Sequence, residues 1–178
     1  MKVLKALPIF VLVFVFMGCK EEEPAVVEDT ISIFYFIRHA EKERYDTENP
    51  DPELSQKGLG RAMHWAEILD DVPIDAVYTT DYERTQMTAA PIAVKKNLTV
   101  QIYDPDLIDL EQFKADNLNK KVLVVGHSDS TPDFVNKLIG QEKYDQIDDD
   151  QNGNLFVVEI VNGIATDMRL NINCNCPD

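Results

Sequence analysis

The sequence predicts an α/β domain, built as a three-layer α/β/α sandwich around a mostly parallel sheet. Short apolar runs alternate with segments of helical periodicity over most of the chain, and this alternation is typical of parallel sheets covered by helices on both faces. The chain has 178 residues, of which 44% are hydrophobic, with only 7 Gly and 9 Pro. This is enough for one domain with a substantial core.

The first elements follow from apolar patterning and capping. Residues 31–37 form a continuous apolar and aromatic run, as a strand buried on both faces requires. Ser55 is a candidate N-cap for a helix whose apolar positions recur at three- and four-residue spacing. Those positions are Leu59, Ala62, Ala66 and Leu69. Residues 76–80 are predicted to form a second strand. Residues 83–96 have helical character, but Pro91 lacks a backbone donor, so a kink or a split is expected there.

The alternation continues through the second half of the chain. The predicted elements are strands over 98–103 and 121–126 and a weaker helix over 110–118. A further helix is framed by Thr131 as N-cap, Pro132 at the first helical position and Gly140 beyond its end.

The chain then changes to a β pattern. Residues 155–161 and 165–172 flank Asn162-Gly163, which predicts a closing hairpin. Before it, residues 148–153 together with Glu159 fit the spacing of a calcium-binding loop. Because a strand over 155–161 carries Glu159 away from such a loop, we interpret the acidic segment as a turn that leads into the strand. Calcium binding is the alternative.

The first residues follow a different rule. Lys2 and Lys5 precede an apolar run over 6–17, which is shorter than the roughly 20 residues that span a bilayer. Residues 1–18 are therefore predicted to be a signal peptide. The run ends in Phe-Met-Gly before Cys19, which resembles the bacterial lipobox and makes Cys19 the predicted lipidation site. The alternatives are an uncleaved N-terminal anchor, or an ordinary signal peptide with Cys19 incidental.

The net charge and the N-terminal residues predict where the protein is located and which class of partner is excluded. Residues 19–30 are acidic and lack periodicity, as a solvated tether would. With a lipid anchor to the membrane, the chain is predicted to be an exported lipoprotein of the bacterial cell envelope, on the periplasmic side or at the outer-membrane surface. The net charge of −15 argues against nucleic acid as a partner, because phosphate backbones are bound by clustered Lys and Arg.

Polar residues directly follow two of the predicted strands. Arg38 and His39 come after the first strand and His127 comes after the fourth. Ligands of open parallel sheets bind outside the carboxyl ends of the strands. Two of the three histidines therefore lie where a site is expected. The third, His64, lies on a predicted helix and is interpreted as structural or exposed.

Four segments, in order, resemble the histidine phosphatase superfamily, which includes cofactor-dependent phosphoglycerate mutases and bacterial phosphohistidine phosphatases. They are Arg-His-Ala at 38–40, Leu-Ser-x-x-Gly at 54–58, Thr-x-x-x-Arg-Thr at 80–85 and Val-Gly-His-Ser at 125–128. Thr80 and Thr85 stand where the family pattern has Ser and Ala. The resemblance implies a phosphoglycerate mutase-like fold, with the domain over 31–173 and a C-terminal tail over 174–178.

The resemblance also implies phosphoryl transfer through a phosphohistidine. His39 would attack phosphorus, and Arg38 and Arg84 would bind the phosphate oxygens, for which planar guanidinium groups are suited. His127 would donate to the same oxygens. A surface ion pair on its helix is the alternative for Arg84. No metal and no organic cofactor are implied.

The residue that protonates the leaving group is left open. Asp129, two residues after His127, and Glu41, two residues after His39, are the candidates, with Glu111 as a third. For each of them a solvated surface acid is the alternative.

Two cysteines lie near the end of the chain. Cys174 and Cys176 are separated by one residue, so a strained local disulfide or two free thiols are both compatible with the sequence. A metal site needs more ligands than these two cysteines supply.

The sequence therefore predicts a histidine-type acid phosphatase that hydrolyses a phosphomonoester or a phosphoramidate. Its substrate would be a small phosphorylated metabolite or a phosphorylated protein side chain. Hydrolysis is favoured over a phosphomutase reaction, because the short chain leaves little room for segments that enclose a bisphosphate. The alternative is a non-catalytic phosphate-binding or adhesive lipoprotein that keeps the fold. Binding alone does not require a nucleophile, which speaks against it.

Overall fold

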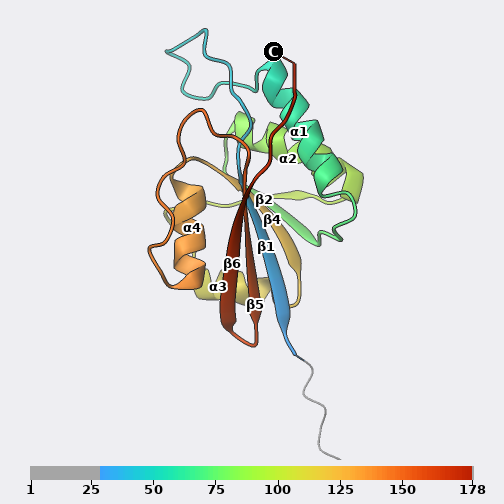
Figure 1. Cartoon of the computed structure of the whole chain (residues 1–178), viewed down its shortest axis with the longest axis vertical. Coiled ribbons are helices and arrows are strands. Elements are labelled where there is room, and N and C mark those ends of the chain that lie inside the picture. Colours follow the sequence, from blue (N-terminus) through green and yellow to red (C-terminus); the bar gives the residue numbers. More distant parts are fainter. Residues whose placement is uncertain (1–28, 178) are drawn as a thin grey trace, which may run out of the picture.

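The computed structural model describes residues 29–177 of the chain (Figure 1). The predicted signal peptide over 1–18, the predicted lipidation site Cys19 and nearly all of the predicted tether lie outside the described residues. Within residues 29–177 no helix is long and apolar enough to cross a membrane.

Six strands form one sheet in the order β3-β2-β4-β1-β5-β6. The parallel strands are β1 (Ile31–Arg38), β2 (Ala76–Thr79), β3 (Val100–Ile102) and β4 (Lys121–Gly126). The antiparallel strands at the other edge are β5 (Asn154–Val161) and β6 (Ile164–Asn171). The prediction of a mostly parallel sheet is confirmed.

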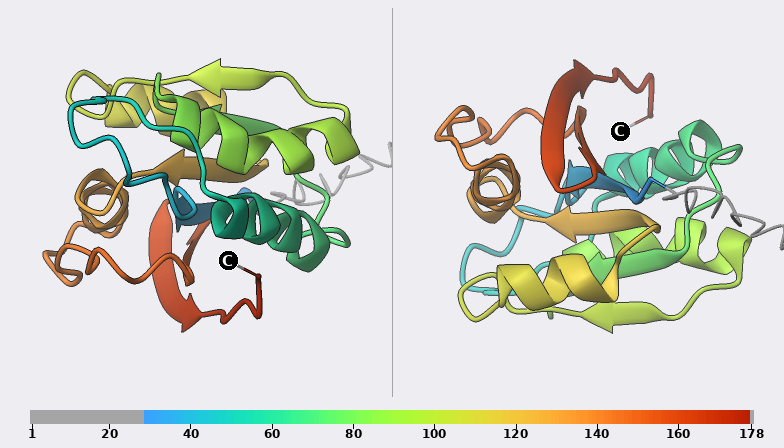
Figure 2. Two further views of the ribbon diagram at one scale, coloured as in Figure 1. Left: turned by 90° about the horizontal axis from the view of Figure 1, so that it is seen from above. Right: turned by 90° about the horizontal axis from the view of Figure 1, so that it is seen from below.

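Helices cover both faces of this sheet (Figure 2). They are α1 (Gln56–Ile68), α2 (Glu83–Lys96), α3 (Leu110–Asp116) and α4 (Ser130–Ile139). One face packs against α1 and α2 and the other against α3 and α4, which confirms the three-layer α/β/α sandwich.

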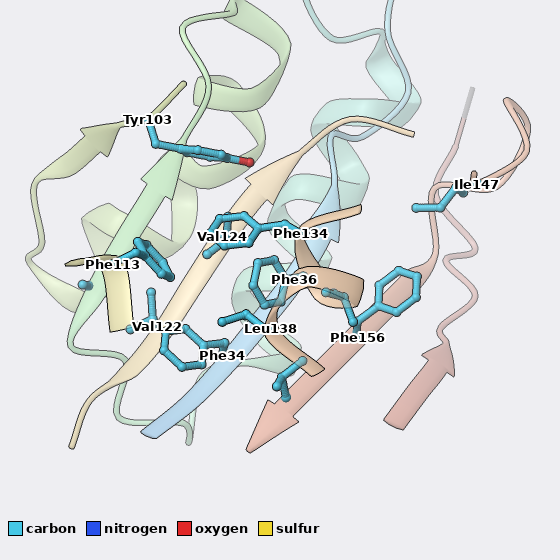
Figure 3. Close-up of a cluster of buried hydrophobic side chains, with 13 residues drawn as sticks. Phe34, Phe36, Tyr103, Phe113, Val122, Val124, Phe134, Leu138, Ile147 and Phe156 are labelled. Carbon is cyan, nitrogen blue, oxygen red and sulfur yellow. The ribbon is translucent and has the colours of Figure 1, made fainter. Parts of the chain in front are cut away.

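The alternation of side chains along the central strands divides the core in two. Phe34 and Phe36 of β1 point toward α3 and α4, where they pack on Phe113 and Phe134 (Figure 3). Ile37 joins the cluster under α1 and α2 on the other face. Burial on both sides fixes the register of β1, because a shift by one residue would move every side chain to the wrong face. The strand ends are thereby fixed as well.

The helix over Glu83–Lys96 continues through Pro91 without the split considered there, because its buried face packs on the sheet and on α1 across the missing backbone donor. Two other local predictions were wrong. The N-cap of α4 is Asp129, whose carboxylate accepts from the Ser130 backbone N–H at 2.7 Å, whereas Thr131 is buried inside the helix. Leu59, predicted for the apolar face of α1, is exposed.

The segment around the predicted hairpin matches the turn interpretation. β5 begins at Asn154 and carries Glu159 opposite Ile33 of β1. Asn162 and Gly163 adopt positive φ angles of 52° and 83° between β5 and β6. Beyond β6, Cys174 and Cys176 are joined in a disulfide, one of the two alternatives that the sequence allowed.

Candidate active site

The parallel pairing of β1 and β4 brings the two expected histidines together. Arg38 is in register with Gly126, so His39 and His127 leave neighbouring strands at the same edge of the sheet. Their ring centroids are 5.5 Å apart. Arg84 reaches the same place from the first turn of α2. A pocket of about 490 Å³ is lined by all four of these side chains.

The hydrogen bonds of His39 determine which of its nitrogens is free. Its Nδ1 lies 2.7 Å from the carbonyl oxygen of Ala40, which can only accept, so Nδ1 carries the proton. Nε2 then keeps its lone pair. The ring is 4% exposed, and burial is the main cause that lowers the pKa of His39 to about 3, against the opposing effect of the bond to Ala40. Repulsion by Arg38 and Arg84 lowers it further, so this imidazole is neutral at neutral pH.

A short chain of hydroxyl groups fixes the proton of His127. Thr85 Oγ1 donates its single proton to a backbone carbonyl, with the oxygens of Thr80 and Tyr82 at 2.9 and 2.8 Å. Thr85 must therefore accept from Thr80 Oγ1, 3.1 Å away. Thr80 in turn has only its lone pairs left for His127 Nε2, at 2.8 Å, so Nε2 of His127 is protonated.

This assignment changes what His127 can do in its neutral form. Its Nδ1 holds a lone pair and lies 3.5 Å from Nη2 of Arg84. Burial, and then the Arg84 charge, lower the pKa of His127 to about 4. Neutral His127 has therefore already used its only N–H on Thr80. To donate to a phosphate oxygen, as the sequence analysis expects, it needs a second proton on Nδ1.

Arg38 is held from the loop that precedes β5. Its side chain is 2% exposed, Nη1 donates to the Asp148 carbonyl oxygen at 2.8 Å, and Nη2 donates to Asp149 Oδ1 at 2.6 Å. The Arg38 charge and the hydrogen bond from Arg44 hold the pKa of the Asp149 carboxyl well below its usual range, with Arg44 the larger cause. The buried charge of Arg38 is thus paired.

Arg84 has a different carboxylate partner. Its Nη1 lies 3.1 Å from Asp51 Oδ1, and its guanidinium stacks 4.2 Å from the ring centre of Tyr82. The helical surface ion pair considered as an alternative for Arg84 is replaced by this contact across the pocket wall. Within residues 29–177, Nε of Arg38 and Nε of Arg84 are buried and have no hydrogen-bond partner. Each guanidinium group has five N–H donors, which is more than its hydrogen bonds to these partners use, so both retain N–H groups on their Nη atoms for an anion.

The three candidate proton donors lie in three different places. Asp129 lines the pocket. Glu41 instead binds Arg61, with Nη2–Oε1 at 2.7 Å, and lines a neighbouring pocket. Burial alone would raise the pKa of the Glu41 carboxyl, but the hydrogen bonds from Arg61 outweigh it and lower that pKa. Glu111 is exposed and pairs with Lys114 on α3, and it does not line the pocket. Of the three, only Asp129 lines the pocket that contains His39.

Several other residues line the pocket without having been predicted as site residues from the sequence. They are Lys42, Thr80, Tyr82, Asp106, Asp133 and Asp149. Thr80 lies inside a motif that resembles the family pattern, but the motif gave no reason to place its hydroxyl beside His127. Asp149 lies inside the calcium-like motif, which suggested a metal ligand and not a partner for Arg38. Within residues 29–177, no three His, Cys, Asp or Glu side chains gather as metal ligands would.

Comparison with known proteins supports the histidine phosphatase superfamily. Residues 34–111 match its family model, the histidine phosphatase superfamily (branch 1). Phosphoserine phosphatase 1 of Hydrogenobacter thermophilus is 35% identical over 83 residues, which cover 42% of this chain and 37% of that protein. A 2,3-bisphosphoglycerate-dependent phosphoglycerate mutase of Chlamydia abortus is 29% identical over 97 residues, which cover 52% and 43%. The chain thus spans less than half the length of these curated relatives.

Solved structures share the fold over a larger part of the chain. The protein histidine phosphatase SixA complexed with tungstate superposes with a TM-score of 0.65 at 17% identity, covering 78% of this chain and 96% of that one. The α-ribazole phosphatase from Shigella flexneri gives a TM-score of 0.60 at 19% identity, covering 79% and 96%. At these identities the likeness establishes the phosphoglycerate mutase-like fold.

Proposed function

We propose that this chain is a phosphatase that hydrolyses a phosphomonoester or a phosphoramidate through a phosphohistidine on His39. One observation carries the proposal: the Nδ1 proton of His39 is bound to the Ala40 carbonyl, so a buried neutral ring presents the Nε2 lone pair beside two guanidinium groups. A nucleophile of this kind must be unprotonated at the attacking atom, and its second nitrogen must hold the proton.

The reaction has two steps. In the first, His39 Nε2 forms a bond to phosphorus while the bond to the leaving oxygen or nitrogen breaks, and the leaving atom takes a proton from an acid in the pocket. In the second, water gives a proton back to that acid and forms a bond to phosphorus, while the bond from phosphorus to Nε2 breaks; phosphate leaves and the ring regains its lone pair. Arg38 and Arg84 neutralise the phosphoryl oxygens in both steps. Asp129 is the acid that we assign to the leaving group.

Binding of the substrate brings one extra proton into the pocket. Neutral His127 cannot donate to a phosphoryl oxygen, because its only N–H is bound to Thr80. A phosphoryl dianion near Nδ1 favours the imidazolium form, and a substrate monoanion can deliver the same proton itself. In either case His127 holds one proton more in the bound state than in the free protein.

Hydrolysis fits the surroundings of the pocket better than a mutase reaction. β3 ends at Ile102 and α3 begins at Leu110, so only a short connection is available on that side to cover a substrate. A mutase must exclude water from its phosphoenzyme, whereas a phosphatase needs water to reach it. A small phosphorylated metabolite or a phosphorylated protein side chain remains the proposed substrate class.

Rapid quenching with an activated aryl phosphate tests the proposal. We expect an acid-labile phosphoenzyme in the wild type and neither phosphoenzyme nor turnover in His39→Ala. His64→Ala is the matched control, because His64 lies on α1 outside the pocket, and it should keep both. If the wild type forms no phosphoenzyme and His39→Ala binds inorganic phosphate as tightly as the wild type, the chain is a phosphate-binding protein instead.

We also propose, from the sequence alone, that the domain works in the bacterial cell envelope on a lipid attached to Cys19. The Cys19→Ser variant should leave the membrane fraction and keep its phosphatase activity, because the tether carries no group of the pocket. Retention of this variant in the membrane with an uncleaved N-terminus would show that the apolar run itself is the anchor.

A further inference from the structure

The loop between α4 and β5 contacts both strand ends that form the pocket. The Ile147 backbone N–H donates to the carbonyl oxygen of Ser128, the residue after His127, at 2.8 Å. The buried side chain of Asn152 donates to the carbonyl oxygen of His39 at 2.9 Å. The loop is therefore fastened on both sides of the segment that reaches Arg38.

Asp149 in this loop lines the pocket and joins two arginines. Its Oδ1 accepts from Arg38 Nη2 at 2.6 Å, and its Oδ2 lies 2.8 Å from Arg44 Nη1. Both carboxylate oxygens are thus engaged. Two cations share one anion, so the group keeps a net positive charge. The carboxylate fixes Arg38 without removing the positive potential that a phosphate would meet.

This arrangement gives a use to the motif that fits a calcium loop by spacing alone. Such a motif would offer a metal the side chains at its first, third and fifth positions, which are Asp148, Asp150 and Asn152. The groups used in this structure are different ones, the carbonyl oxygen of Asp148 and the carboxylate of Asp149. Here both are bound by the Arg38 guanidinium. Glu159, the last position of the motif, lies on β5 opposite Ile33. The cation that this segment holds is a side chain.

We propose that Asp149 is a positioning residue for the reaction, an inference that rests on the proposed function. A guanidinium group has five N–H donors. Asp148 and Asp149 each take one donor from Arg38, so Nη1 and Nη2 each keep one N–H, and the Nε–H is buried without a partner. Held at Nη1 and Nη2, the planar group has one orientation, and its free donors meet the phosphoryl group without a search through rotamers.

The opposite role, a carboxylate plug that competes with phosphate for Arg38, fits the contacts less well. A plug must leave when the substrate enters. Asp149 is held by Arg44, the neighbouring Asp148 carbonyl also accepts from Arg38, and the loop is bound at Ile147 and Asn152. Rotation of the Asp149 side chain out of the pocket would break its contacts with both Arg38 and Arg44. Withdrawal of the whole loop would also break the bonds of Ile147 and Asn152.

Two substitutions in the same loop, each of which removes one negative charge, test the inference. Asp149→Asn removes the charge that holds Arg38. Asp150→Asn is the matched control, because Asp150 is exposed and bonds to neither Arg38 nor Arg44. For Asp149→Asn in the full chain we expect kcat/KM with an aryl phosphate to fall about 10- to 100-fold, and the inhibition constant of inorganic phosphate to rise. Asp150→Asn should match the wild type in both.

A second variant guards against simple unfolding. Arg44 is 58% exposed, so Arg44→Gln should fold and give a smaller loss in the same direction, because Asp149 then keeps only one partner. Tighter inhibition by phosphate in Asp149→Asn would establish the plug and overturn the inference. So would kinetics of Asp149→Asn and Arg44→Gln equal to those of Asp150→Asn. If the proposed phosphatase function itself is wrong, the result is different: the wild type shows no turnover of the aryl phosphate.

Discussion

Folding lowers the pKa of His39 to well below the mildly acidic range, and the free energy of unfolding should depend on pH for that reason. The ordinary pKa of a histidine is 6.5, and burial in the pocket lowers the pKa of His39 to about 3. Between these values the unfolded chain binds a proton on His39 and the folded chain does not. Stability contributed by the neutral ring is therefore present above pH 6.5 and is lost as the pH falls toward 3.

The size of the effect follows from the pKa difference. At pH 5 the unfolded imidazole lies about 1.5 pH units below its pKa, and each unit corresponds to about 1.4 kcal/mol, so His39 alone costs about 2 kcal/mol of unfolding free energy relative to neutral pH. That is a large share of the roughly 5–15 kcal/mol by which domains are stable. His127, with a pKa lowered to about 4, acts in the same direction.

Urea unfolding at pH 7 and pH 5 measures the contribution of His39 to the free energy of unfolding. The wild type should lose about 2 kcal/mol more than His39→Gln between the two pH values, because glutamine does not titrate. His64→Gln, on α1 outside the pocket, should keep the pH dependence of the wild type. If the wild type and His39→Gln lose the same free energy, His39 binds protons equally in both states, and a buried neutral nucleophile is the wrong description.

Other predictions concern the neighbours of the pocket. Glu41→Gln should destabilise the fold by about 2 kcal/mol in thermal unfolding, because it weakens the pairing of nearly buried Arg61, and should leave turnover unchanged. Loss of turnover without loss of stability would restore Glu41 as a proton donor. Thr80→Val removes the acceptor for His127 Nε2–H and should lower kcat about tenfold or more, whereas Thr80→Ser should retain kcat. Equal kcat values would contradict the assigned tautomer. Finally, with an activated aryl phosphate, whose leaving group needs no proton from Asp129, kcat/KM should be level from about pH 4, the lowered pKa of His127, to about pH 6, near the second pKa of a phosphomonoester, and then fall tenfold per unit. A rise above pH 6 would show that the dianion binds to neutral His127.

The main elements of the fold could be predicted because the strands are apolar runs and the helices have periodic faces. β3 shows the limit, since three residues pair instead of the predicted six. Its outer neighbour is solvent, and Gln101 and Ile102 are exposed, so apolar burial does not define its ends. The start of α4 shows another limit. Asp129, Ser130 and Thr131 are adjacent and are all good N-cap residues. Burial removes Thr131 from the choice, and the bond from Ser130 N–H to the Asp129 carboxylate identifies Asp129 as the cap.

The four main residues of the pocket could be placed from sequence, because each lies at a strand end or in a motif next to one. Their partners could not. Asp149 is 111 residues from Arg38, and the contact depends on the path of a loop that no periodicity describes. Glu41 failed as a candidate for a related reason. Closeness in sequence to His39 says nothing about orientation, and the Glu41 side chain turns away to Arg61, 20 residues along the chain.

The excess of acid in the chain and a site for phosphate are compatible because they act over different distances. A net charge of −15 repels a dianion at long range, but salt screens exposed charges beyond about 10 Å. In the pocket the guanidinium groups of Arg38 and Arg84 act at contact distance and largely shielded from water, where their charges are screened much less. The carboxylates of Asp149 and Asp51 then serve to keep these two cations buried and oriented. An acid-rich protein can in this way hold a basic site, provided that each buried cation has its own anion and keeps further N–H donors for the substrate.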